Sequence, residues 1–221
     1  MATFLAQQGI AVITYDKRGV GESGGTYRGP EAGTNNIDAA NLDLLASDVS
    51  EASNALHQRL QSTRIPLGLI GFSQAGWVIP LAAAKNNKVK YMVLFSGPVV
   101  STLEQLRFQF YTHGNTKFWE THTEAEAREH MRSDQDRYKF ESTDPRDALS
   151  KLSIPGLWIF GGRDIQAPVG LSIEHLDTLK AQGKSYAYHL YNELGHNTAN
   201  SPDTLNLVLR WIRSWVKSQN M

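Results

Sequence analysis

Residues 67–77 read LGLIGFSQAGW, and this stretch decides the fold that the sequence predicts. A short apolar run leads into Ser73, and a helix-compatible segment follows at residues 77–84. In a nucleophile elbow the serine lies on a tight turn between a buried strand and a helix, and the residues two before and two after it must be small. Gly71 and Ala75 meet this requirement, although the usual motif, G-x-S-x-G, ends in glycine. Because such pentapeptides also occur in ordinary strand-to-helix turns, the interpretation depends on partners elsewhere in the chain.

The composition bounds the class of protein. A chain of 221 residues with 41% apolar and 20% charged residues is typical of one globular domain with an insertion. Lys plus Arg equals Asp plus Glu, at 22 each, so no net field favours nucleic acid and we expect no nucleic-acid partner. The sequence has no cysteine, which excludes disulfides, thiol catalysis and cysteine-ligated metals.

The sequence also lacks recognisable membrane and targeting signals. No apolar run approaches the roughly 20 residues that a membrane helix needs, so we expect no membrane span. Residues 1–8 lack the basic start and the long apolar centre of a signal peptide. The localisation is therefore left unknown, and a cytoplasmic location is expected only if the chain is complete as given.

Short apolar runs alternate with amphipathic stretches along the chain. Strands are predicted at residues 10–15, 67–70, 89–95 and 185–191, and a strand followed by a loop is predicted at 154–164. Helices are predicted at residues 2–8, 37–60, 77–84, 169–182 and 203–217. This alternation predicts an α/β fold, with a mostly parallel sheet covered by helices on both faces.

Residues 101–153 break the alternation. This segment is rich in charge and in large aromatic residues at helical spacing, and it has few strand signals. We therefore predict a helical cap insertion at 101–153, lying over the end of the sheet, and a core formed by residues 1–100 and 154–221. We refer to residues 101–153 as the cap segment.

A glycine-rich loop at residues 19–24 matches the dinucleotide-binding pattern G-x-G-x-x-G. That pattern works when its glycines open a helix whose N-terminus faces a pyrophosphate. Here residues 24–30 read GGTYRGP, which cannot form the first turns of a helix. We therefore expect no nucleotide cofactor, and we expect Asp16 and Arg18 to pin the loop in place.

Three cap residues could in principle hold a metal ion, since His122, Glu126 and His130 share one helical face by their spacing. A charged helix face explains the same pattern, so no metal is expected. Three further histidines lie within predicted helices or a strand, so each is expected to be solvated or packed: His57, His175 and His189.

Three loops at the predicted carboxyl ends of strands each supply one chemically useful group: Ser73, Asp164 and His196. A serine hydroxyl is a poor nucleophile unless a base takes its proton, and the base needs an acid to hold its tautomer. In an open parallel sheet such groups gather at the carboxyl ends of the strands. Two simpler readings remain open at this point, since Asp164 could only cap the turn before Pro168 and His196 could be an exposed loop residue.

Four stretches together resemble an α/β-hydrolase of the esterase and serine-aminopeptidase kind. They are YDKRGVGES at 15–23, the elbow at Ser73, residues 155–168 around Asp164, and LGH at 194–196. The order Ser, Asp, His along the chain is also the one that this family uses.

The resemblance implies a role for each matched residue. Ser73 would be the nucleophile, His196 the general base and then acid, and Asp164 the group that orients the imidazole. The backbone N–H of Gln74 would donate one hydrogen bond to the oxyanion. Such an enzyme needs no metal and no cofactor.

The sequence departs from the family at its start. In the family three strands and a His-Gly-type loop precede the helix at which this chain begins, and the third of those strands lies between the predicted strands 10–15 and 67–70. Its loop supplies the second oxyanion donor. Three explanations are open: the chain is a fragment, a second subunit supplies the strands through the free sheet edge as in a homo-oligomer, or strand 10–15 moves beside strand 67–70 and brings residues 16–19 to the oxyanion.

The sequence as a whole predicts a serine hydrolase that cleaves a small-molecule carboxylic ester through an acyl-enzyme, as a carboxylesterase does. Phe72 and Trp77, beside the serine, are expected to line an apolar pocket for an acyl or aryl group. A peptidase or thioesterase of the same fold is the near alternative. A non-catalytic, hydrolase-like interaction module is the alternative from another class.

Overall fold

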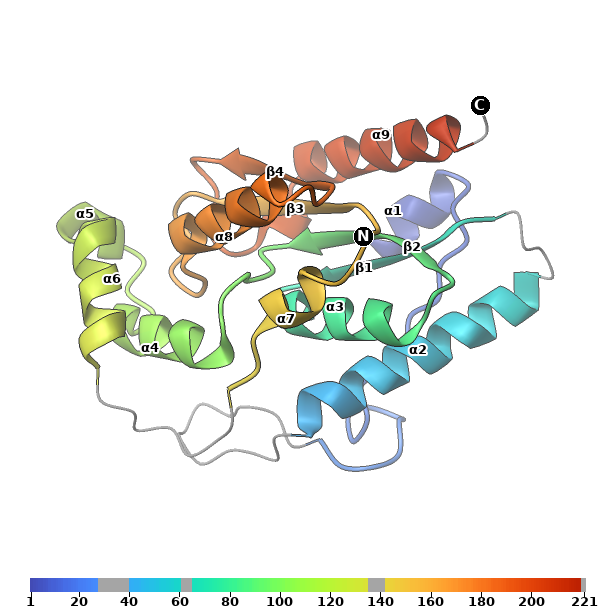
Figure 1. Cartoon of the computed structure of the whole chain (residues 1–221), viewed down its shortest axis with the longest axis horizontal. Coiled ribbons are helices and arrows are strands. Elements are labelled where there is room, and N and C mark those ends of the chain that lie inside the picture. The colour runs from blue at the N-terminus through green and yellow to red at the C-terminus, as the bar shows by residue number, and fades with distance from the viewer. Residues whose placement is uncertain (28–39, 61–64, 135–141, 220–221) are drawn as a thin grey trace.

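The computed structural model describes residues 1–27, 40–60, 65–134 and 142–219. Within these residues four strands form one sheet, in the order β1–β2–β3–β4, and every neighbouring pair is parallel (Figure 1). The strands are β1 (Leu67–Phe72), β2 (Val89–Phe95), β3 (Gly156–Gly161) and β4 (Tyr186–Tyr191). The predicted parallel sheet is confirmed.

Helices alternate with the strands, as the sequence predicts. They are α1 (Ala2–Gln7), α2 (Asn41–Leu60), α3 (Ala75–Lys85), α4 (Thr102–Thr112), α5 (Phe118–Thr121), α6 (Glu124–Ser133), α7 (Pro145–Leu149), α8 (Val169–Ala181) and α9 (Pro202–Ser218), with a short 3₁₀ helix η1 (Thr198–Asn200). The predicted bounds agree to within a few residues. Residues 37–39 of the predicted helix 37–60 lie outside the described part of the chain.

The sheet is covered on both faces. Helices α2, α3 and α8 pack against one face, where their apolar residues surround Leu94 of β2 and Trp158 of β3. Helix α9 covers the other face, where Val208 and Ile212 pack against Val93. Figure 1 shows α9 along one side of the sheet and α2 with α3 along the other. Because β2 is buried on both faces, its sequence is almost continuously apolar, VKYMVLF, rather than alternating.

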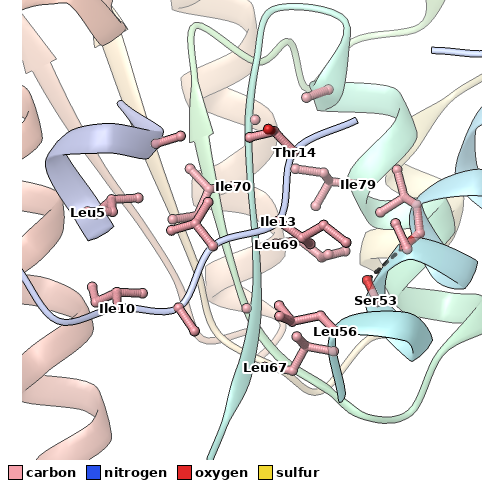
Figure 2. Close-up of a pocket in the computed structure, with 18 of the residues that line it drawn as sticks. Leu5, Ile10, Ile13, Thr14, Ser53, Leu56, Leu67, Leu69, Ile70 and Ile79 are labelled. Carbon is pink, nitrogen blue, oxygen red and sulfur yellow. Dashed lines mark hydrogen bonds between the residues drawn. The ribbon is translucent and has the colours of Figure 1, made fainter. Parts of the chain in front are cut away.

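The predicted strand at residues 10–15 is wrong. These residues form no strand, and β1 has β2 as its only strand partner among the described residues. The local sequence, IAVITY, is β-branched and suits a strand, but a strand needs a hydrogen-bonding neighbour. Here the segment lies across a cavity from β1 and not against it (Figure 2). The explanation in which strand 10–15 pairs with β1 is therefore also wrong.

The described part of the cap segment is helical and contains α4, α5, α6 and α7. Helices α4 to α6 lie together at one end of the molecule (Figure 1). Their side chains form an apolar cluster centred on Phe108 and Phe118. In contrast, α7 packs on the core, since Leu149 is buried there and its carbonyl accepts a hydrogen bond from the Tyr186 hydroxyl at 2.8 Å. Among the described residues, no helix combines the length and the apolar character needed to cross a bilayer.

The buried middle of the sheet generates the first prediction. Leu94→Ala removes a fully buried side chain from between β2 and the α2–α3 layer, and we expect a loss of about 2–5 kcal/mol of unfolding free energy. Leu190→Ala is the matched control, because Leu190 is exposed on β4 and should cost less than about 1 kcal/mol. Urea unfolding followed by circular dichroism measures both. Equal losses would contradict the assigned layers.

Candidate active site

Ser73 lies on a strained turn between β1 and α3. Its φ angle is 52°, in the left-handed region that residues with a side chain rarely adopt. Two backbone hydrogen bonds hold the turn: the Ser73 N–H donates to the Phe95 carbonyl at 2.8 Å, and the Gly76 N–H donates to the Ser73 carbonyl at 2.8 Å. The first bond ties the turn to the end of β2. The serine hydroxyl therefore projects from the carboxyl edge of the sheet.

The small residues around Ser73 are required by direct contacts. A Cβ atom on Gly71 would lie 2.3 Å from the Ala75 Cβ and 2.9 Å from Ile79 Cδ1. A Cβ atom on Gly76 would lie 2.5 Å from Pro98. The departure from the usual motif is thus accommodated, because the methyl group of Ala75 occupies the space that Gly71 leaves free.

Ser73, His196 and Asp164 form one hydrogen-bonded chain. The Ser73 Oγ lies 2.8 Å from His196 Nε2, and His196 Nδ1 lies 2.8 Å from Asp164 Oδ2. The acid and the histidine are buried, at 1% and 8% exposure. Residues that are 123 and 32 positions apart in the sequence are therefore brought together in the order that nucleophilic catalysis needs.

The Asp164 carboxylate has two kinds of partner. Its Oδ2 faces His196, while Oδ1 accepts hydrogen bonds from the backbone N–H groups of Gln166 at 2.7 Å and Ala167 at 3.0 Å. Asp164 thus caps the turn before Pro168 and also holds the imidazole. The contacts expected for a turn cap and for a partner of the histidine are both present.

The His196 loop is fixed from the end of β2 by Ser96, a residue that the sequence reasoning did not select. The buried Ser96 hydroxyl donates to the His196 carbonyl at 2.5 Å and lies 2.8 Å from the Thr198 hydroxyl. The glycine at the end of β3 is also needed, since a Cβ on Gly161 would lie 2.2 Å from the Gly195 carbonyl oxygen. The signal in the sequence that could have identified Ser96 is a polar residue directly after an apolar strand.

The cap segment holds the acid loop through two further hydrogen bonds. The Trp119 indole N–H donates to the Asp164 carbonyl at 2.8 Å, and the Thr112 hydroxyl donates to the Ile165 carbonyl at 2.7 Å. The Trp119 ring is stacked on Phe108, with 6.0 Å between their centroids. The position of Asp164 therefore depends on α4 and α5 as well as on the sheet.

Gln74, the expected oxyanion donor, is the residue before α3. Its backbone N–H has no hydrogen-bond acceptor among the described residues. Its side chain accepts from Lys17 Nζ at 2.6 Å and donates to the Tyr27 hydroxyl at 3.2 Å. Neighbouring protein removes water from the Lys17 ammonium group and lowers its pKa. The loop at residues 16–19 thus contacts the elbow through the side chains of Lys17 and Gln74.

The two expected pocket residues differ. Phe72 is exposed, and its ring centroid lies 5.0 Å from that of His196, so this ring borders the site. The expectation that Trp77 lines the pocket is wrong, because Trp77 is buried in the core and its indole N–H donates to the Val100 carbonyl at 2.8 Å. It does not face the serine's surroundings.

The other candidates from the sequence have structural contacts. His122 is stacked on Phe118 and His130 on Tyr111, while Glu126 caps α6 by accepting from the Thr123 N–H at 2.7 Å. Hydrogen bonds from Thr123 lower the pKa of the Glu126 carboxyl. No group of three potential ligands for a metal ion occurs among the described residues.

The glycine-rich loop is a structural turn. The Gly19 N–H donates to the Gly24 carbonyl at 3.0 Å, and the described residues that follow, 25–27, are not helical. Asp16 accepts from the Glu22 N–H at 3.3 Å, and Arg18 Nε donates to Asp48 at 2.7 Å. The expectation that Asp16 and Arg18 pin this loop is confirmed.

The profile described as the prolyl oligopeptidase family matches residues 1–219. No curated protein matches the sequence.

Solved structures share the fold at low sequence identity. An esterase from Pyrococcus furiosus is 16% identical with a TM-score of 0.57, and the match covers 97% of this chain and 69% of that one. An acetyl xylan esterase from Paenibacillus sp. R4 is 17% identical with a TM-score of 0.57, and the match covers 90% of this chain and 64% of that one. The acylaminoacyl peptidase of Pyrococcus horikoshii is 16% identical with a TM-score of 0.54. The match covers 78% of this chain and 27% of that one, so this chain spans about a quarter of that protein. The α/β-hydrolase fold expected from the sequence is confirmed.

The elbow contacts generate the second prediction. Gly71→Ala places a methyl group against Ala75 and Ile79, and we expect a loss of about 1–3 kcal/mol of unfolding free energy from overpacking. Gly24→Ala is the control, because a Cβ there meets no atom within 4 Å and its φ angle is ordinary. Chemical unfolding measures both variants. If Gly71→Ala is as stable as the native chain, the elbow accommodates an added methyl group and the prediction is wrong.

Proposed function

Because the chain belongs to the prolyl oligopeptidase family, we propose that it is a serine hydrolase that forms an acyl-enzyme on Ser73. The observation that carries the proposal is the continuous chain of 2.8 Å contacts from Ser73 through His196 to Asp164. We further propose that the bond cleaved is a small-molecule carboxylic ester. The names of the similar esterases support this choice, and the exposed Phe72 ring offers an apolar surface beside the nucleophile.

The proposed reaction follows from the positions of these groups. His196 Nε2 accepts the Ser73 proton as Oγ attacks the carbonyl carbon, and the imidazolium donates Nδ1–H to Asp164. The tetrahedral oxyanion accepts a hydrogen bond from the Gln74 N–H. Collapse of this intermediate expels the alcohol, which takes its proton from Nε2. A water molecule then releases the acid by the same steps. Each proton transfer is assigned to a protein side chain, and the reaction as written uses no metal or cofactor.

Cleavage of a peptide bond is the second candidate. The description of the family itself and the likeness to acylaminoacyl peptidases favour it. The chemistry at Ser73 would be identical, and only the leaving group would differ. Matched p-nitrophenyl esters and p-nitroanilides with the same acyl group separate the two, because only a peptidase releases p-nitroaniline at a measurable rate, and we expect turnover of the ester without release of p-nitroaniline.

Removal of the nucleophile generates the third prediction. Ser73→Ala should abolish labelling by a fluorophosphonate probe and lower the turnover of p-nitrophenyl butyrate by about 10⁴-fold or more. Ser150→Ala, at an exposed serine, is the control and should label and turn over like the native chain. Labelling that persists in Ser73→Ala would place the nucleophile elsewhere. A folded native chain that neither labels nor turns over would favour the interaction module.

The contact between the cap segment and the acid loop generates the fourth prediction. Trp119→Phe keeps an aromatic ring but removes the hydrogen bond to the Asp164 carbonyl. A typical intramolecular hydrogen bond contributes about 0.5–1.5 kcal/mol, so we expect kcat to fall by roughly 2- to 10-fold with KM unchanged. Trp211→Phe is the control, since Trp211 lies against Tyr91 on the α9 face. A raised KM with unchanged kcat would mean that Trp119 only contacts substrate.

A further inference from the structure

One guanidinium group connects helices α4, α7 and α8 where the cap segment meets the core. Arg146, in the first turn of α7, donates from Nε to the Asp144 carboxylate at 2.8 Å and from Nη2 to the Glu104 carboxylate at 3.3 Å. Its Nη1 lies 2.8 Å from Nε2 of His175 on α8. Asp144 caps α7 and Glu104 belongs to the capping box of α4. Arg146 therefore connects the starts of both helices to α8.

The two ends of the cap segment are also bonded to each other. The Thr102 N–H donates to the Thr143 carbonyl at 2.9 Å, and the Thr143 N–H donates to the Thr102 hydroxyl at 3.0 Å. Residues 41 positions apart in the sequence thus lie side by side where the cap segment leaves the core and returns to it. Arg146 lies next to this crossing and connects it to α8 through His175.

The contact between Arg146 and His175 fixes the protonation state of the imidazole. A guanidinium group has N–H donors and no acceptor. Nε2 of His175 must therefore present its lone pair to Nη1 of Arg146, so the ring is neutral and carries its hydrogen on Nδ1. A proton on Nε2 would remove this hydrogen bond and would place a second positive charge beside the guanidinium.

The groups around His175 act on its pKa in opposite directions. Neighbouring protein removes water from the imidazole and lowers its pKa below the ordinary value of 6.5, and the positive charge of Arg146 lowers it further. The carboxylates of Glu104, Asp144 and Glu174 raise the pKa, but they do not outweigh burial and Arg146. His175 therefore takes up a proton less readily in this arrangement than in water. The arrangement is fully favoured above about pH 6.5, and it is destabilised as the pH falls below that value.

The neighbouring contacts between the cap segment and α8 lack this sensitivity. Arg128 of α6 donates to Glu174, the residue before His175, at 2.7 Å. This hydrogen bond lowers the pKa of the Glu174 carboxyl, so Glu174 stays charged in mild acid. The Val99 N–H donates to the Ser172 hydroxyl at 3.1 Å, in a bond without a titrating group. Of these contacts, the one at His175 responds to protons near neutral pH.

We propose that His175 is a proton-sensitive latch, which holds α4 and α7 on α8 through Arg146 while it is neutral and releases them when it is protonated. The same cap segment holds the loop of Asp164 through Trp119 and Thr112, so release would also loosen the support of the acid. Release is a structural event, and it is measured without turnover and independently of the proposed function.

Hydrogen exchange of the full chain at about pH 7.5 and about pH 5.5, corrected for the chemical effect of pH on exchange, measures the latch. In the native chain we expect the protection of α4 and α7 to fall by roughly three- to tenfold at the lower pH. Tenfold is the approximate limit, because a histidine that titrates near pH 6.5 when released can shift the opening equilibrium by about that much over one pH unit. The protection of α2, which lies outside the cap segment, should not change.

Substitutions assign the effect to His175. His175→Gln keeps an acceptor near the position of Nε2 but cannot be protonated, so protection should agree at the two pH values to within about twofold. His175→Lys places a permanent charge beside Arg146 and should show at about pH 7.5 the loss that the native chain shows only in acid. His189→Gln, exposed on β4, is the matched control and should behave like the native chain. Circular dichroism at both pH values checks that each variant is folded.

Three results would overturn the role of His175. Equal protection of α4 and α7 at both pH values in the native chain would show that the contact does not respond to protons. An acid-induced loss that persists in His175→Gln would place the titrating group elsewhere, with His122 and His130 of the cap segment as the next residues to replace. An equal loss of protection in α2 would identify acid unfolding of the whole chain.

Discussion

The left-handed backbone at Ser73 is the constraint on which the rest of the site depends. It turns the chain out of β1 and into α3 within two residues, and it directs the hydroxyl towards His196. Such a conformation persists only where its surroundings enforce it. Here the bond from the Ser73 N–H to Phe95 and the close contact between Gly71 and Ala75 do so. The sheet and the first helix layer thus act together as a support for one strained residue.

The other two members of the site are held by elements far from them in sequence. Ser96, at the end of β2, fixes the His196 backbone, and Trp119 and Thr112 fix the acid loop. These supports come from side chains that bond to backbone carbonyls, so they determine where the loops lie more than which residues the loops carry. A site with the same three residues and without these supports would have the right groups at less exact distances.

The sequence predicted the features that depend on local pattern. The apolar runs of β2 and β3, the small residues at the elbow and the order of Ser73, Asp164 and His196 all follow from neighbouring residues or from chemistry. What it missed depends on distant partners. Residues 10–15 have the composition of a strand but no strand to pair with among the described residues, and Trp77 is buried in the core, where Val100, 23 residues away, accepts its N–H. Residue types and spacing do not contain that information.

The bonds from α4 and α5 to the acid loop change how this chain can diversify. Variable insertions over a conserved sheet usually allow binding surfaces to change while the chemistry stays constant. Here Trp119 and Thr112 belong to the insertion, yet they support Asp164. A replaced cap segment would therefore also replace the hydrogen bonds that position the loop of Asp164. In this chain, the cap segment and the position of Asp164 thus do not change independently.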